Sequence, residues 1–310
     1  MSKRIFITGA AGLVGQNLIP LLKQDPDLEI VGVDKHAANV AILRELHPEM
    51  EVIEADLAED GAWQAGIAAS DVVVLLHAQI GGLQEAEFER NNVLATRKCL
   101  DAMAGGKVSH LVHVSSSVVN SMADDFYTRS KAAQEKIVAE IDIPHVILRP
   151  TLMYGWFDRK HLGWLRRFME KAPLFPIPGS GRYLRQPLYA GDFSAIIHSC
   201  IADAMTGTYN ISGQERIDYI DLIREIRDVN GLRTPIVKIP YWTFWMLLRT
   251  YAVFSASPPF TTKQLEALVT PDVFEVIDWP EIFSVRSTPL REALEETFRH
   301  PVYSKVVLEF

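Results

Sequence analysis

The chain has few cysteines, no excess of basic residues and no long uninterrupted apolar run. Its 310 residues include only Cys99 and Cys200, too few for the disulfide framework of a small secreted domain. The 39 acidic residues outnumber the 31 Lys and Arg residues, for a formal charge of −8. A chain without an overall basic surface is not expected to bind nucleic acid.

Two apolar stretches are too short to suggest a targeting or membrane-spanning segment. The N-terminal MSKRIFITGAAG has a brief apolar run that ends in glycines, unlike the core of a signal peptide. The segment Tyr241–Phe254, YWTFWMLLRTYAVF, is interrupted by Arg249 and is shorter than the ~20 residues that cross a bilayer. We expect this segment to pack in a core, although it could line an apolar pocket or rest on a membrane surface. A cytoplasmic protein with no integral membrane segment is expected.

The first half of the chain alternates short runs of β-branched residues with longer helix-like segments. The runs fall at residues 4–8, 29–33, 51–54, 72–77, 111–115 and 145–148. Their almost continuous apolar character is typical of strands buried on both faces, and the intervals suit crossover helices. The pattern predicts an α/β fold with a doubly wound parallel sheet of the Rossmann type.

A glycine-rich loop follows the first of these runs. The stretch ITGAAGLVGQNLI places Gly9, Gly12 and Gly15 after an expected strand and before an expected helix. Glycines permit the tight turn and let backbone N–H groups approach a pyrophosphate at the helix N-terminus. Glycines also occur in turns that only pack, but this strand–loop–helix context favours a dinucleotide-binding loop.

Two acidic residues bear on the identity of the dinucleotide. Asp34 ends the second expected strand, 19 residues after Gly15. A carboxylate there accepts hydrogen bonds from an adenosine ribose and repels a 2′-phosphate, so NAD is favoured, while neighbouring Lys35 leaves NADP open. Asp56, after the third run, could approach the adenine edge or cap a helix.

The amino-acid composition of the chain changes after Arg149. Prolines at positions 150, 173, 176 and 178 and glycines at 179 and 181 punctuate this part. A strand is expected at residues 209–211 and a helix at 219–230. We expect residues 1–150 to form an NAD-binding Rossmann domain. Residues 151–310 are expected to form mainly a smaller C-terminal substrate lobe, with some segments returning to the sheet.

Taken together, these motifs resemble those of the short-chain dehydrogenase/reductase superfamily. Within it they resemble the extended branch, which is the branch like the NAD-dependent epimerases and dehydratases of nucleotide sugars. In the first half the resemblance is carried by the glycine spacing, LLHAQIGG (75–82), NNVLAT (91–96), HVSSSVV (113–119) and YTRSKAAQE (127–135). It extends through LRPTLMYG (148–155), GSGRYLRQPLYAGD (179–192) and TYNISG (208–213). The match therefore covers roughly residues 3–213.

The resemblance implies that Ser116, Tyr127 and Lys131 are catalytic, with Ser117 the alternative serine. Tyr127 and Lys131 are four residues apart at the start of a helix-like segment, a spacing that places both on one face. The ammonium group and the positive nicotinamide of NAD⁺ would lower the pKa of Tyr127 from its usual value of about 10. The phenol could then exchange a proton with a substrate hydroxyl, while the serine steadies the reacting oxygen.

The resemblance also assigns residues that bind the cofactor and the substrate. The residues expected to contact NAD are Gly9, Ala11, Gly12, Leu13, Val14, Gly15, Asp34, Asp56, Leu57, His77, Ala78, Asn92, Ser115, Tyr127 and Lys131. Arg185 matches the family arginine that grips a nucleotide diphosphate, for which a guanidinium fork is suited. Arg182 and Ser117 are further substrate-binding candidates. No metal-ligand spacing is present.

Three departures from the family pattern narrow the expected reaction. The interval of 11 residues from Ser116 to Tyr127 is shorter than expected for the extended branch. Ser117 and Val118 stand where a family dehydratase would carry an Asp-Glu pair, which disfavours dehydration. Leu152 stands where the epimerases often carry an asparagine that contacts the sugar-nucleotide phosphates, which weakens the nucleotide-sugar assignment.

The expected function is therefore an NAD-dependent epimerase or ketoreductase acting on a nucleotide-sugar by a Ser-Tyr-Lys mechanism. Two alternatives are an NAD(P)-dependent reductase or dehydrogenase of a hydrophobic alcohol or ketone, and a non-catalytic dinucleotide-binding protein. The resemblance further implies a homodimer formed by helices at residues 85–104 and 127–140.

Overall fold

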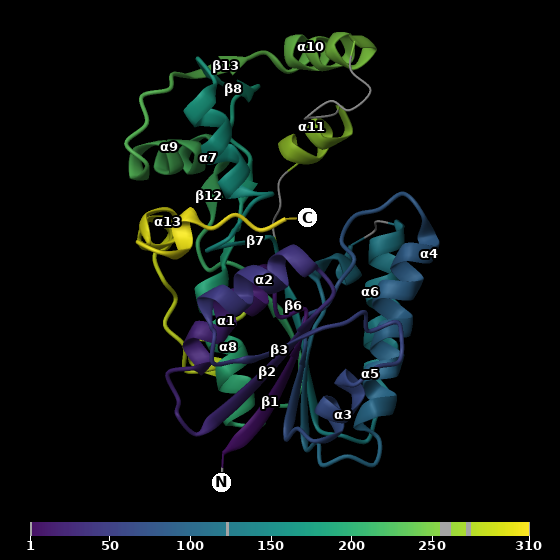
Figure 1. The fold of residues 1–310 in the computed structure, drawn as a ribbon. Helices are drawn as coiled ribbons and strands as arrows, with labels where there is room; N and C mark the ends of the chain where they lie inside the picture. The colour runs from purple at the N-terminus through teal and green to yellow at the C-terminus, as the bar shows by residue number, and fades with distance from the viewer. Residues whose placement is uncertain (1, 122–123, 255–261, 271–273, 310) are drawn as a thin grey trace.

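A computed structural model of the chain describes residues 2–121, 124–254, 262–270 and 274–309. Its larger part is built on seven parallel strands (Figure 1). These are β1 (Lys3–Thr8), β2 (Leu28–Asp34), β3 (Glu51–Glu54), β4 (Val72–Leu75), β5 (His110–Val114), β6 (His145–Pro150) and β11 (Gly207–Ile211). They are ordered β3-β2-β1-β4-β5-β6-β11 across the sheet. The predicted doubly wound α/β fold is confirmed, and its seventh strand comes from the second half of the chain.

The two faces of the sheet are covered by different helices because successive strand residues point to opposite sides. Ile5 and Ile7 pack on one face in a cluster with residues of α1, α2 and α8. Phe6, between them, packs on the other face with residues of α3, α5 and α6. Figure 1 shows these two layers on either side of the strands. The helices are α1 (Leu13–Leu22), α2 (Ala37–Leu46), α3 (Trp63–Ala68), α5 (Ala95–Met103), α6 (Phe126–Ala139) and α8 (Ala190–Ala202).

The strand order reverses between β1 and β4, which lie side by side in register with Thr8 opposite Leu75. Doubly wound sheets bind ligands beyond the carboxyl ends of their strands at such a switch point. The glycine loop follows β1, and the segment from Leu76 to Ala78 follows β4. The fold therefore brings two of the expected cofactor-binding segments together.

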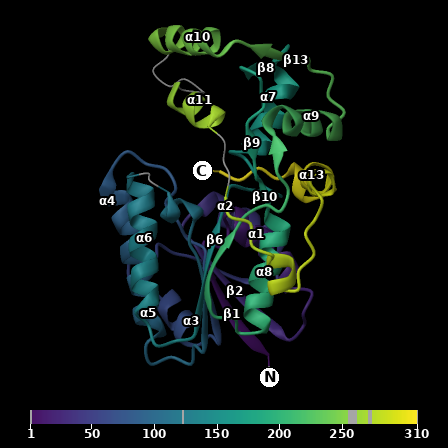
Figure 2. The ribbon, with the colours of Figure 1, turned by 180° about the vertical axis from the view of Figure 1, so that it is seen from behind.

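A smaller lobe with its own apolar cluster lies beyond the carboxyl ends of the strands (Figures 1 and 2). Its strands form three pairs: β7 (Met153–Tyr154) with β10 (Leu188–Tyr189), β8 (Phe175–Pro178) with β13 (Ile236–Ile239), and β9 (Leu184–Arg185) with β12 (Ile217–Asp218). Its helices are α7 (Leu162–Lys171), α9 (Tyr219–Val229), α10 (Tyr241–Phe254), α11 (Thr262–Val269) and α13 (Leu290–Arg299). Two short elements, α12 (Trp279–Ile282) and η3 (Tyr303–Lys305), complete the C-terminal part.

The helix expected at residues 85–104 is interrupted in the structure. It consists of α4 (Glu85–Phe88), a π-helical turn η1 (Glu89–Leu94) and α5. A π-turn inserts an extra residue and changes the direction in which the following side chains point. Asn92 lies in this turn and is fully buried, so the interruption positions one of the expected site residues.

Among the described residues, no helix has both the length and the apolar character needed to cross a bilayer. Cys99 and Cys200 are both buried and carry free thiols.

Candidate active site

The loop after β1 is shaped by glycines that no other residue could replace without displacing the backbone. Gly9 has a φ of +65°, and a Cβ there would lie 2.8 Å from the backbone nitrogen of His77. A Cβ at Gly15 would lie 2.4 Å from the carbonyl oxygen of Ala10. These close approaches hold the first turn of α1 against the ends of β1 and β4.

The start of α1 provides the features that a pyrophosphate requires. Gly12 occupies the N-cap position, and no side chain caps this end of the helix. A Cβ at Gly12 would contact only the carbonyl oxygen of Gly9, at 3.3 Å. The backbone therefore presents its positive helix end with little side-chain cover, and Leu13 and Val14 are partly exposed in the first turn. This geometry fits a dinucleotide phosphate.

Asp34 ends β2 beside this loop. One carboxylate oxygen accepts a hydrogen bond from the backbone N–H of Ala11 (3.1 Å), and the other from that of His36 (3.0 Å). Burial raises the pKa of Asp34, although these backbone donors oppose the rise. The carboxylate is thus fixed next to the phosphate loop, where the sequence places a ribose ligand.

Asp56 and its neighbour lie further along the same edge of the sheet. Asp56 accepts hydrogen bonds from Arg90 Nη1 (2.7 Å) and from the backbone N–H of Ala58 (2.9 Å). Leu57 is buried, whereas Ala78, after β4, is exposed. The Asp56 carboxylate therefore forms an ion pair with Arg90 and stabilises a turn at Ala58.

Ser116 and Tyr127 are brought together from two different elements. Ser116 follows β5 and precedes the short 3-10 helix η2 (Ser117–Asn120), and Tyr127 is in the first turn of α6. The Ser116 hydroxyl lies close enough to the phenol of Tyr127 to lower the pKa of that phenol. Ser117 instead begins η2, so of the two candidate serines it is Ser116 that meets the tyrosine.

The protein alone raises the pKa of Tyr127. Burial is the main cause, the carboxylate of Asp125 adds to the rise, and Ser116 opposes it. Lys131 Nζ donates its hydrogen bond to the backbone carbonyl of Val114 (2.9 Å). The desolvation of the phenol therefore outweighs the opposing effect of Ser116.

Lys131 is itself completely buried. Burial lowers the pKa of its amine to about 7, against an opposing effect of Glu135. The neighbouring Ser115 hydroxyl is also buried, and none of the described residues forms a hydrogen bond with it. Buried polar groups without partners are uncommon in folded proteins and suit a place where a bound molecule supplies the missing partner.

A chain of hydrogen bonds runs from Gln134 on α6 to Thr8, the residue before Gly9. Gln134 Nε2 on α6 donates to Thr96 Oγ1 (2.7 Å), and Thr96 Oγ1 lies 3.0 Å from His77 Nε2. His77 Nδ1 lies 2.8 Å from Thr8 Oγ1. Burial lowers the pKa of His77 to about 3, so its ring is neutral and bridges two hydroxyl groups. We expect His77 to hold β1 and β4 in place rather than to act as an acid.

Asn92 continues this network to the tyrosine. Its amide accepts from the backbone N–H of Gln79 (2.6 Å) and donates to the carbonyl of the same residue (3.1 Å). It also donates to Ser130 Oγ (2.8 Å), which in turn donates to the carbonyl of Tyr127 (2.8 Å). Asn92 therefore ties the segment after β4 to the first turn of α6.

Sequence reasoning did not identify Thr8, Thr96, Gln79, Ser130 or Gln134 as part of this network. Thr96 follows Asn92 by four residues and Gln134 follows Lys131 by three. Helical spacing of this kind places side chains on one face and could have found Thr96 and Gln134, but not Thr8 or Gln79, which lie outside the helices.

The candidate substrate-binding arginines lie in the smaller lobe. The guanidinium group of Arg185 donates to the backbone carbonyls of Leu268 and Thr270, at the end of α11, and lies 5.4 Å from the ring centre of Tyr183. Arg182 pairs with Asp218 (2.9 Å) and is largely exposed. In this arrangement Arg185 anchors α11 to β9.

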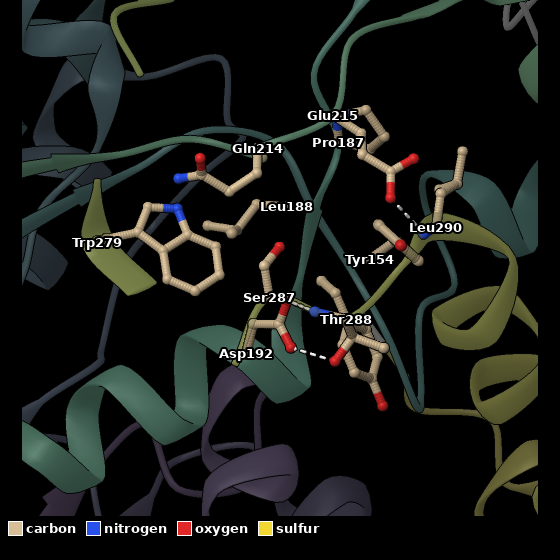
Figure 3. Close-up of a pocket in the computed structure, with 12 residues that line it drawn as sticks. Tyr154, Pro187, Leu188, Asp192, Gln214, Glu215, Trp279, Ser287, Thr288 and Leu290 are labelled. Carbon is tan, nitrogen blue, oxygen red and sulfur yellow. Dashed lines mark hydrogen bonds between the residues drawn. The ribbon is translucent and has the colours of Figure 1, made fainter. Parts of the chain in front are cut away.

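A cavity of about 20 Å³ lies at the junction of the sheet and the lobe (Figure 3). Asp192 points toward Thr288 there and accepts from its backbone N–H (3.0 Å) and its hydroxyl (2.5 Å). The space suffices for about one water molecule. A larger hollow of about 320 Å³ lies at the opposite, amino-terminal edge of the sheet, beside Lys3 and His198. Neither is positioned between the glycine loop and Tyr127.

The chain matches the model of one protein family and is similar to several known proteins. The model of the NAD dependent epimerase/dehydratase family matches residues 5–212, more than half of the chain. A mitochondrial protein of Mus musculus, NADH dehydrogenase [ubiquinone] 1 alpha subcomplex subunit 9, is 24% identical over 96% of this chain and 80% of its own length. The ceramide reductase of Caulobacter vibrioides is 25% identical over 76% of this chain and 73% of its own.

A solved structure extends the likeness to the whole fold. UDP-glucuronic acid 4-epimerase from Bacillus cereus, in complex with NAD, superposes with a TM-score of 0.72. The alignment covers 95% of both chains at 21% sequence identity. At this identity the likeness shows a shared fold.

Proposed function

Because the chain belongs to the NAD-dependent epimerase/dehydratase family, we propose that it is an epimerase or ketoreductase that acts on a nucleotide-sugar. The observation that carries this proposal is that Ser116 lies close to Tyr127, with the fully buried Lys131 on the same helix as the tyrosine. The glycine loop and Asp34 of the same sheet edge support NAD as the cofactor. Ser117 and Val118 offer no carboxyl pair for dehydration, so we do not propose a dehydratase.

In this mechanism, Tyr127 exchanges a proton with the hydroxyl of the reacting carbon. NAD⁺, when bound, supplies the hydride acceptor and a positive charge. That charge favours the phenolate of Tyr127 and offsets the effect of burial. Ser116 donates a hydrogen bond to the reacting oxygen, and Lys131 binds the ribose of the cofactor. In an epimerase the same tyrosine returns its proton after the keto intermediate has reoriented in the site, so no net reductant is consumed.

One observation favours a second candidate, an NAD(P)-dependent reductase or dehydrogenase of a hydrophobic alcohol or ketone. The guanidinium group of Arg185, which would grip a nucleotide diphosphate, donates instead to two backbone carbonyls of the α11 end. The resemblance to a ceramide reductase is in keeping with this candidate. A purely dinucleotide-binding role would leave the neighbouring Ser116 and Tyr127 without a function.

The test is product analysis by NMR of the purified protein with NAD⁺ and a panel of UDP-, GDP- and dTDP-sugars. Tyr127→Phe is expected to lower kcat by about 10² to 10⁴, the usual contribution of a general acid/base. Tyr303→Phe, in η3 of the C-terminal part, is the matched control and is expected to retain activity.

The products distinguish the candidates. A new sugar isomer formed without net NADH supports the epimerase, and net NADH formation supports a dehydrogenase. Oxidation of a long-chain alcohol by NAD⁺, with no conversion of any sugar, would replace the first candidate with the second. Equal activity of Tyr127→Phe and the wild type would overturn both.

A further inference from the structure

Helix α10 carries large apolar side chains that the rest of the molecule does not cover. Trp242, Met246 and Leu247 are 71%, 64% and 57% exposed. Among residues 241–250, whose side chains the structure describes, none is buried. Trp242 and Met246 are four residues apart and share one face of the helix.

The apolar character of α10 is not confined to one face. Tyr241, Phe244, Trp245 and Leu248 are only partly buried, and the rings of Tyr241 and Trp245 contact that of Trp242. A helix that is apolar all round is normally enclosed by protein or by lipid. Its 14 residues span about 21 Å, less than the ~30 Å of a bilayer core. Such a helix can be covered by lipid only if it lies along the membrane surface.

The charges around α10 identify the kind of surface that it suits. No Asp or Glu occurs between Asp228 and Glu266, whereas this stretch contains four basic residues, Arg233, Lys238, Arg249 and Lys263. The whole chain has a formal charge of −8. Arg233, Lys238 and Arg249 are exposed. The segment from residue 229 to residue 265, which contains α10, is therefore basic on an acidic protein and can approach a negatively charged surface.

The aromatic residues give the second part of the match. Trp and Tyr are enriched where membranes meet water, because their rings are apolar and their N–H or O–H groups are polar. The guanidinium group of Arg249 lies 5.3 Å from the ring centre of Trp245. An arginine in this position can keep its charge among lipid headgroups while its stem lies beside the apolar rings.

The position of α10 also suits a surface contact. It lies at the end of the smaller lobe that is remote from the seven-stranded sheet (Figure 1). Val237, in the strand that leads into the helix, is 41% exposed. A flat surface could therefore contact α10 and the start of this segment without meeting the sheet domain.

We propose that α10 is a peripheral membrane-binding helix that lies in the interface of an anionic phospholipid bilayer. Trp242, Met246 and Leu247 enter the apolar boundary, and Lys238 and Arg249 contact the headgroups. A second copy of the chain fits less well, because pairing two such helices would bring two basic regions together. This proposal is independent of which substrate the active site takes.

The experiment is vesicle flotation of the full chain. Vesicles of phosphatidylcholine alone are compared with vesicles that also contain phosphatidylglycerol. Trp242→Ser/Met246→Ser is expected to lower the partition coefficient on the anionic vesicles by about tenfold or more, since two large apolar side chains are lost from the interface. Lys238→Ser and Arg249→Ser are each expected to lower it about fivefold.

Leu83→Ser is the matched control, because Leu83 is 95% exposed but lies in the larger domain, in the segment between β4 and α4. It is expected to bind as the wild type does. Circular dichroism checks that each variant is folded, and light scattering in the absence of lipid measures the oligomeric state.

Stronger binding to the anionic vesicles, lost in the apolar variant and weakened by salt, supports the proposal. Absence of binding to either vesicle, or equal binding by Trp242→Ser/Met246→Ser and the wild type, overturns it. The proposal also fails if the apolar variant turns an oligomer into a monomer and the wild type does not bind vesicles. That result would identify a second copy as the partner of α10.

Discussion

Lys131 provides a test of how strongly the interior of this fold acts on a charged group. Its amine is fully buried, and burial lowers its pKa from 10.5 to about 7. The perturbation is Lys131→Met, which keeps the length of the side chain and removes the ionisable group. It also removes the hydrogen bond to Val114.

The sign of the effect follows from the direction of the pKa change. Between pH 7 and 10.5 the unfolded chain binds a proton at Lys131 that the folded chain has released. The free energy of unfolding therefore rises with pH across this window and is lowest below it. A lowering from 10.5 to about 7 corresponds to about 5 kcal/mol over the whole window. Between pH 6 and pH 9 it contributes about 2–3 kcal/mol.

The assay is urea unfolding of the protein, without added dinucleotide, at pH 6 and at pH 9. The wild type is expected to gain about 2–3 kcal/mol relative to Lys131→Met on going to the higher pH. The lost hydrogen bond to Val114 affects both pH values and drops out of this difference. Lys136→Met, an exposed lysine on the same helix, is the control and is expected to follow the wild type.

Parallel pH dependences of the wild type and Lys131→Met would refute the reasoning. They would mean that Lys131 is ionised in the folded protein at pH 9 as it is in the unfolded chain. Its amine would then be hydrated or paired in a way that its buried position does not show.

Three further perturbations test other parts of the structure. Gly15→Ala places a Cβ 2.4 Å from the Ala10 carbonyl oxygen, so calorimetric titration is expected to show NAD affinity lowered at least tenfold. Burial raises the pKa of Asp192 from 3.8 to about 6. Stability is expected to fall as pH rises from 4 to 6, and this fall should be absent in urea unfolding of Asp192→Asn. His77→Phe leaves two buried hydroxyl groups without their ring partner, and should lower the free energy of unfolding by about 2 kcal/mol.

Much of the sheet was predictable from the sequence because its signals are local. All six expected strands of the first half are present, with ends shifted by at most two residues. The apolar runs identify them because parallel strands are buried on both faces. The glycine loop was equally readable, since the positive φ of Gly9 and the close contact of Gly15 restrict residue type at each position.

The interruption of the helix around Asn92 is a feature that the local sequence did not predict. Residues 85–104 have a helical pattern, but nothing in their sequence marks the π-turn Glu89–Leu94. The amide of Asn92 bonds to Gln79 and Ser130, which are 13 and 38 residues away. A turn held by such contacts depends on segments that the local pattern does not contain.

By itself, then, the sequence determined the parallel sheet, the dinucleotide loop and the spacing of Tyr127 and Lys131, because each depends on residues close together in the chain. Only the tertiary structure decided that burial raises the pKa of Tyr127, and that Arg185 bonds to carbonyls more than 80 residues away. It also decided the low pKa of Lys131 and the exposure of Trp242. Desolvation and long-range contacts depend on what the completed fold places around a side chain, and no local pattern in the sequence records that.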